Sequence, residues 1–79
     1  MHADEVKLLI ENGLPGAEVE VRTDDDTHFE AVIVSPEFAG KLTLARHKMV
    51  YATLGERMGR EIHALSMRTF TPEERAGGK

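Results

Sequence analysis

Two neighbouring segments with a period-two apolar pattern restrict the fold of this chain more than any other feature. They cover residues 17–22 and 28–35, and in each an apolar face recurs at every second position. This period predicts two strands that each bury one face. The intervening run Asp24-Asp25-Asp26-Thr27 breaks the pattern and predicts a turn. We therefore expect a β-hairpin with His28 at its rim, next to the acidic turn.

Two longer helices are expected, one before the hairpin and one after it. In the first, Asp4 is expected to cap the start, and Gly13 occupies the C-terminal position that glycine prefers. The second follows the proline that stops the second strand and covers residues 42–54. Its clearest apolar stripe consists of Leu42, Ala45, Met49 and Ala52. Two cations on this helix, Arg46 and Lys48, are expected to reach solvent.

The C-terminal third predicts a short helical turn at residues 56–60 and a last strand at residues 62–70. The run Thr71-Pro72-Glu73-Glu74 is a capping box with proline at the first helical position, so a short terminal helix is expected. The order is then helix, strand, strand, helix, short helix, strand. It predicts a two-layer α+β domain, a three-stranded sheet with helices on one face. We place the domain at residues 1–75 and a flexible C-terminal tail at residues 76–79.

The chain of 79 residues contains no cysteine. It therefore forms no disulfide of its own and offers no thiolate nucleophile and no all-cysteine metal site. No apolar run approaches the roughly 20 residues that span a bilayer. The acidic N-terminus resembles neither a secretory signal nor an arginine-rich transit peptide. We expect a cytoplasmic protein that does not associate with membranes.

Charge is distributed unevenly along the chain. Residues 1–40 carry ten carboxylates and two cations, whereas residues 41–60 carry five cations and one carboxylate. A basic block on an acidic domain suggests a face for an anionic partner, although an unevenly charged solvated surface explains the pattern equally well. The three consecutive aspartates lack the alternating ligand spacing of an EF-hand loop, so we interpret them as a solvated turn. No motif or constellation for catalysis is present, so an enzyme is not expected.

Several short motifs, taken in order, resemble the BolA family. They are Phe38-Ala39-Gly40-Lys41, Arg46-His47-Lys48 with Val50-Tyr51, Ile62-His63-Ala64-Leu65-Ser66 and Thr71-Pro72-Glu73. The resemblance runs from the first helix to the terminal capping box. It implies a type II KH-like fold and a monothiol glutaredoxin as partner, with a [2Fe–2S] cluster held between the two proteins. It also implies that His63 is one cluster ligand and that His28 is the other, as in the branch with a histidine in the loop between the first two strands.

Under this interpretation the chain is a non-enzymatic adaptor in iron–sulfur cluster trafficking or in iron or redox regulation. Neutral imidazole is a suitable iron ligand, and Rieske centres place two histidines on one iron. Without cysteine the chain is expected to bind no cluster alone, so the thiolates must come from the partner. Without the resemblance, a lone histidine is more simply interpreted as a structural or surface residue. By itself the chain is expected to be a monomer or a weak homodimer.

The resemblance implies a second, alternative activity, DNA binding by a transcriptional regulator. The candidate contacts are Lys41, Arg46, His47 and Lys48. So few cations allow few phosphate contacts, and the acidic first half opposes attraction, so only weak and salt-dependent binding is expected. Lys48 stands where the family often has arginine, which keeps the charge but loses the bidentate geometry. Residues 55–59 are one residue longer than the Gly-x-x-Gly loop of KH domains, so KH-type RNA binding is not expected.

Overall fold

The computed structural model describes residues 1–77 and has the expected order of elements, with one addition. The elements are α1 (Ala3–Gly13), β1 (Glu18–Thr23), β2 (His28–Val34), η1 (Pro36–Phe38), α2 (Thr43–Leu54), η2 (Gly55–Arg57), β3 (Ala64–Phe70) and α3 (Pro72–Ala76). The addition is the short 3-10 helix η1, which begins at the proline that ends β2. The expected domain boundary at residue 75 falls inside α3, and residues 78–79 of the expected tail lie outside the described residues.

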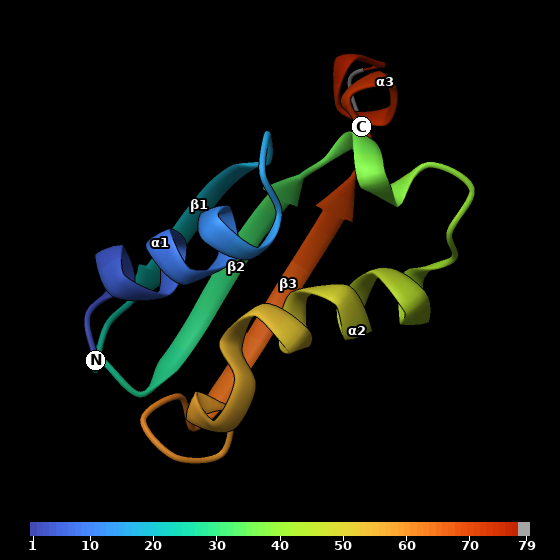
Figure 1. Ribbon diagram of the computed structural model, residues 1–79. Helices are drawn as coiled ribbons and strands as arrows, with labels where there is room; N and C mark the ends of the chain where they lie inside the picture. Colours follow the sequence, from blue (N-terminus) through green and yellow to red (C-terminus); the bar gives the residue numbers. More distant parts are fainter. Residues whose placement is uncertain (78–79) are drawn as a thin grey trace.

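The three strands form one mixed sheet in the order β1-β2-β3 (Figure 1). β1 and β2 pair antiparallel, as the hairpin prediction requires. β2 and β3 pair in parallel, with His28 opposite Ala64 at one end and Val34 opposite Phe70 at the other. Both strands therefore begin at the same end of the sheet. The turn before β2 and the loop before β3 meet there, although they are far apart in the sequence (Figure 1).

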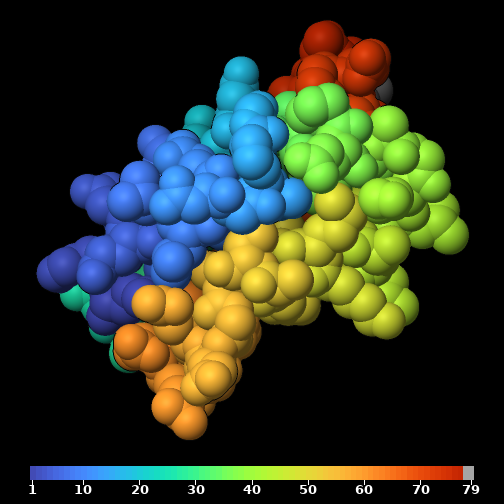
Figure 2. All heavy atoms as spheres, viewed as in Figure 1, coloured from blue at the N-terminus to red at the C-terminus, as the bar shows by residue number. Residues whose placement is uncertain are grey.

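Helices α1 and α2 cover one face of the sheet, which confirms the predicted two-layer α+β architecture (Figure 1). Figure 2 shows this helical side, with α1 in blue against α2 in yellow. One apolar cluster lies between the layers and contains Val6, Ile10, Leu14, Val19, Phe29, Ala31, Ile33, Phe38, Val50, Leu54 and Ile62. The alternation in β2 is confirmed, because Phe29, Ala31 and Ile33 are buried while His28 and Glu30 are exposed. The face of the sheet opposite the helices carries the charged side chains of the strands.

Helix α2 buries a different face from the one that its sequence pattern indicates. Val50 and Leu54 are fully buried, whereas Leu42 is 84% exposed. The two alanines of the expected stripe are exposed as well, whereas its fourth residue, Met49, is partly buried against the core. Leu42 is the N-cap residue and lies outside the helix, which begins at Thr43. Because apolar residues occur all around this helix, periodicity alone does not identify the buried side, and contacts with α1 and the sheet select it.

Local hydrogen bonds stabilise the N-terminal ends of α1 and α3. The prediction that Asp4 caps α1 is wrong, because the N-cap residue is His2, whose backbone N–H donates to Glu5 Oε1 at 2.8 Å. The predicted capping box of α3 is confirmed. Thr71 Oγ1 accepts from the Glu74 backbone N–H at 3.1 Å, and Glu74 Oε1 accepts from the Thr71 backbone N–H at 2.9 Å. These reciprocal bonds satisfy two donors that a helix start leaves free.

Gly13 lies where α1 packs directly against Thr53 of α2. A Cβ atom at this position would lie 2.5 Å from Thr53 Cγ2 and 2.7 Å from Thr53 Cβ. No side chain fits in that space without a shift of one helix. Gly13 is therefore needed for close packing of the two helices. It is the last residue of α1, with Leu14 as the C-cap residue, so it does not occupy the capping position beyond the helix that the sequence indicates.

Candidate metal centre

The imidazole rings of His28 and His63 meet at the end of the sheet where β2 and β3 begin. Their centroids lie 5.1 Å apart, and the ring planes are inclined by 72°. Both residues are exposed to solvent. His28 is the first residue of β2, and His63 directly precedes β3. The parallel pairing of the two strands thus brings together the two histidines that were expected to share a site.

Backbone hydrogen bonds hold the two histidine segments against each other. The carbonyl oxygen of Thr27 accepts from the N–H groups of both His63, at 2.8 Å, and Ala64, at 3.2 Å. On the other side of His63, the Ile62 side chain is fully buried in the core. The Ile62 N–H also donates to the Arg57 carbonyl oxygen at 2.9 Å. The backbone of His63 is therefore fixed from both sides while its ring points to solvent.

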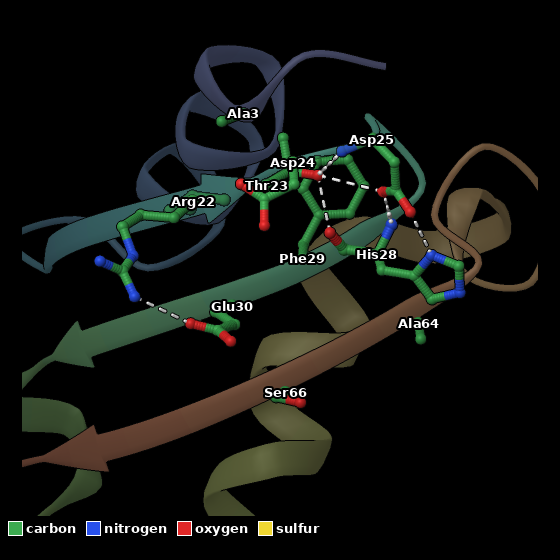
Figure 3. Close-up of a pocket in the computed structure, with 11 residues that line it drawn as sticks. Ala3, Arg22, Thr23, Asp24, Asp25, His28, Phe29, Glu30, Ala64 and Ser66 are labelled. Carbon is green, nitrogen blue, oxygen red and sulfur yellow. Dashed lines mark hydrogen bonds and ion pairs between the residues drawn. The ribbon is translucent and has the colours of Figure 1, made fainter.

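The acidic turn before β2 is organised around the carboxylate of Asp25. Asp25 Oδ1 accepts from the backbone N–H groups of Thr27, at 3.0 Å, and His28, at 2.8 Å. Asp25 Oδ2 lies 2.7 Å from His28 Nδ1 (Figure 3). The bonds from the backbone of His28 and then of Thr27, followed by the His28 ring, hold the pKa of Asp25 well below its usual range. Asp25 is therefore an ionised partner of His28, a role that the run of three aspartates did not reveal.

A second set of bonds closes the same turn from Thr23. Thr23 Oγ1 donates to the carbonyl oxygen of His28 at 2.7 Å and accepts from the Asp26 N–H at 3.0 Å. Asp26 adopts a left-handed backbone with φ of 61°, which aspartate tolerates better than most residues. Each of these contacts restricts the backbone that carries His28. The interpretation of the turn as merely solvated is therefore incomplete.

The spacing of the two rings suits a single metal ion. A metal–imidazole nitrogen bond of about 2.1 Å places two ring centroids about 5 Å apart when both rings bind one metal at a tetrahedral angle. The observed 5.1 Å agrees with this arrangement. Within residues 1–77, no group of three or more histidine, aspartate or glutamate side chains is placed to hold a metal ion. The two exposed rings are thus spaced as two nitrogen ligands of one metal ion would be.

A groove of about 770 Å³ gives access to His28 from solvent. It passes the acidic turn and continues along the sheet beside Arg22, Glu30 and Ser66 (Figure 3). Arg22 Nη2 donates to Glu30 Oε1 at 3.1 Å across this surface. The lining is thus mixed, with polar and charged side chains beside Val21, Phe29 and Ala64, and it is less apolar than a typical pocket for a small ligand.

The side chain of Arg46, a candidate DNA contact, is held by contacts within the chain. Its side chain is 11% exposed, so the prediction that it reaches solvent is wrong. Arg46 Nη1 and Nη2 donate to the two carboxylate oxygens of Glu74 at 2.7 and 3.0 Å, and Nε donates to the Lys41 carbonyl oxygen at 2.8 Å. The guanidinium also lies 5.7 Å from the centroid of the Phe38 ring. Glu74 raises the pKa of Arg46, and Arg46 lowers the pKa of Glu74 to about 2.

The remaining basic candidates lie on α2 or just before it. Lys41 and Lys48 are exposed, and His47 is half-buried. Arg46 contacts the carbonyl oxygen of Thr69, near the end of β3, whereas the histidines lie at its start. Arg46 and the histidine pair therefore lie at opposite ends of β3.

Comparison with known proteins identifies the family. A family model described as "BolA-like protein" matches residues 4–74. The chain belongs to the BolA family. The solved structure of a BolA protein homologue from Coxiella burnetii superposes with a TM-score of 0.87 and 42% sequence identity, and the match covers 96% of this chain and 97% of that one. The expected resemblance and the expected fold are thus confirmed.

Curated BolA relatives match over part of their length. The Escherichia coli protein named "DNA-binding transcriptional regulator BolA" is 40% identical over 57 residues, which cover 72% of this chain and 54% of that protein. The Arabidopsis thaliana protein named "Protein BOLA1, chloroplastic" is 47% identical over 53 residues, or 67% of this chain and 33% of that protein. The matched segment thus spans about half of one relative and a third of the other. Among the described residues, no helix combines the length and the apolar character that crossing a bilayer requires.

Proposed function

We propose that this BolA-family chain is a non-enzymatic adaptor that offers His28 and His63 to a [2Fe–2S] cluster held by a monothiol glutaredoxin. The observation that carries the proposal is the 5.1 Å separation of the two exposed imidazole rings. In this role the cluster is cargo or signal, and it supplies the redox chemistry when bound. The chain contributes two nitrogen ligands and a surface that docks to the partner.

The donor set supports this assignment. Iron accepts neutral imidazole, and two histidines bind one iron of the [2Fe–2S] cluster in Rieske centres. The chain has no cysteine, so sulfur ligands have to come from another protein. A partner whose own cysteine holds the cluster meets this requirement. The exposed end of the sheet and the groove beside His28 leave room for that partner.

The proposal is tested by mixing the chain with a cluster-loaded monothiol glutaredoxin and recording visible circular dichroism. The spectrum should change when the wild-type chain binds, because the ligands and the symmetry of the cluster change. Both His28→Ala and His63→Ala should abolish the change. His47→Ala is the matched control, because His47 lies on α2 and outside the two segments that carry the pair, so this variant should behave like the wild type. An unchanged wild-type spectrum, or one that His63→Ala leaves intact, would contradict the proposal.

Weak DNA binding is the second candidate function. It is favoured by the name of the 40% identical Escherichia coli relative, a DNA-binding transcriptional regulator. On this chain Lys41 and Lys48 are exposed, whereas the guanidinium of Arg46 is held by Glu74. We therefore assign any phosphate contact to the lysines and to neighbouring polar groups. Binding should be weak and should fall steeply with salt.

A further inference from the structure

One oxygen of the Asp25 carboxylate holds the turn, and the other oxygen faces the His28 ring. The first accepts the backbone N–H groups of Thr27 and His28, and the second lies 2.7 Å from His28 Nδ1. Three nitrogen atoms thus converge on one side chain. An ionised carboxylate can only accept hydrogen bonds. A contact of 2.7 Å between this carboxylate and Nδ1 therefore requires a proton on Nδ1.

The hydroxyl group of Thr27 is the competing partner of the same ring nitrogen. Thr27 Oγ1 lies 3.1 Å from His28 Nδ1, which is longer than the contact with Asp25. A hydroxyl group can donate or accept, so it adapts to either protonation state of Nδ1. The carboxylate does not adapt in this way. The carboxylate of Asp25 therefore determines which nitrogen of the neutral His28 ring carries the proton.

We infer that Asp25 is a positioning residue that keeps the proton of neutral His28 on Nδ1 and so leaves the lone pair of Nε2 free for a metal. The part of this inference that concerns the tautomer applies to the chain alone. The part that concerns metal binding rests on the proposed function. A histidine ligand commonly donates its second ring N–H to a carboxylate, which fixes the orientation and increases the basicity of the metal-binding nitrogen.

Replacement of Asp25 by asparagine separates the two tasks of the carboxylate. The amide oxygen can still accept from the backbone of Thr27 and His28, so the turn has its acceptor. The amide nitrogen then faces His28 Nδ1 and donates to it, which moves the ring proton to Nε2. The reversed orientation would place the amide N–H groups against two backbone N–H groups and is disfavoured. Asp25→Asn should therefore keep the fold and reverse the tautomer of His28.

The tautomer is measured by long-range ¹H–¹⁵N correlation spectra of the ¹⁵N-labelled chain, recorded about 1.5 pH units above the usual histidine pKa of about 6.5. In the wild type, Nδ1 of His28 should show the shift of a protonated nitrogen and Nε2 that of an unprotonated one. This is the reverse of the form that free histidine favours in water. Asp25→Asn should exchange the two shifts. Asp24→Asn, which removes the same charge from the adjacent residue, should match the wild type. A wild-type ring with its proton on Nε2 overturns the inference without any variant.

The effect on the metal is read from the same glutaredoxin mixture. Asp25→Asn should weaken formation of the shared cluster by about 10- to 100-fold, the usual effect of losing such a supporting carboxylate. Asp24→Asn should leave it unchanged. If Asp25→Asn reverses the tautomer yet forms the cluster as well as the wild type, the positioning role is refuted. If the wild type shows the proton on Nδ1 but never alters the cluster spectrum, the positioning of the ring is upheld and the proposed function fails. If the wild type alters the spectrum while its ring proton is on Nε2, the proposed function is upheld and the positioning role of Asp25 fails.

Discussion

Arg46 and Glu74, 28 residues apart in the sequence, form a two-point ion pair that ties α2 to α3. Fork-to-fork pairs of this kind combine charge with fixed geometry. Arg46→Ala should lower the free energy of unfolding by about 1–3 kcal/mol, because it also removes the contact with the Phe38 ring. Lys48→Ala, at an exposed position on the same helix, should change it by less than about 0.5 kcal/mol. Urea unfolding followed by far-UV circular dichroism measures both. Equal effects of the two variants would show that the ion pair is not important for stability.

The same ion pair should make stability depend on pH in the acid range. Arg46 and the Thr71 N–H lower the pKa of Glu74 from 4.5 to about 2. The folded state therefore binds this proton less readily than the unfolded state, and the stabilisation is complete above pH 4.5 and is lost as the pH falls towards 2. The stability difference between the wild type and Glu74→Gln should be largest near neutral pH and should shrink as the solution is acidified. Urea midpoints at several pH values test this, and a difference that grows on acidification would contradict the assignment.

A side chain at Gly13 should disturb the contact between α1 and α2. Gly13→Ala places a methyl group 2.5 Å from Thr53 Cγ2, so the helices must separate, at a cost of about 1–3 kcal/mol. Gly77→Ala serves as the control, because the nearest atoms to its added Cβ lie 3.5 Å away, an ordinary contact distance. Thermal unfolding should show a lower midpoint for the first variant and little change for the second. Equal midpoints would mean that the helices adjust freely.

The DNA contacts of this chain, if it binds DNA, should come from Lys41 and Lys48. Replacing both by alanine should make the negative slope of log binding constant against log salt concentration shallower by about 2, since each lysine neutralises about one phosphate. Arg46→Gln, which removes a charge already paired with Glu74, should leave the slope unchanged. Fluorescence anisotropy with a labelled duplex at several salt concentrations gives the slope. A slope that depends on Arg46 and not on the lysines would reverse this assignment.

The features that were predicted correctly rest on local patterns. Alternation identified the buried face of β2, and the capping box at Thr71 forms within four residues. The burial of Arg46 depends on Glu74, which joins it only after the chain has folded, so the helix sequence alone suggested exposure. Likewise, three identical aspartates stand side by side, and only the geometry of the turn shows that Asp25 faces His28.

The meeting of the two histidines followed from the family resemblance and not from any pattern around them. Periodicity predicts strands, but it does not predict that β2 and β3 run in parallel. The length of the connection between them is compatible with several arrangements. The family motifs supplied the topology, and the structure supplied the distance of 5.1 Å.

The parallel pairing of β2 with β3 also determines when the two rings come together. β3 follows α2 and is synthesised after β1 and β2, so a nascent chain that ends before residue 63 contains His28 but not His63. Closing such a long crossover is slow compared with forming the hairpin. The two rings therefore come together only once β3 has joined the sheet, and any local opening that detaches β3 separates them.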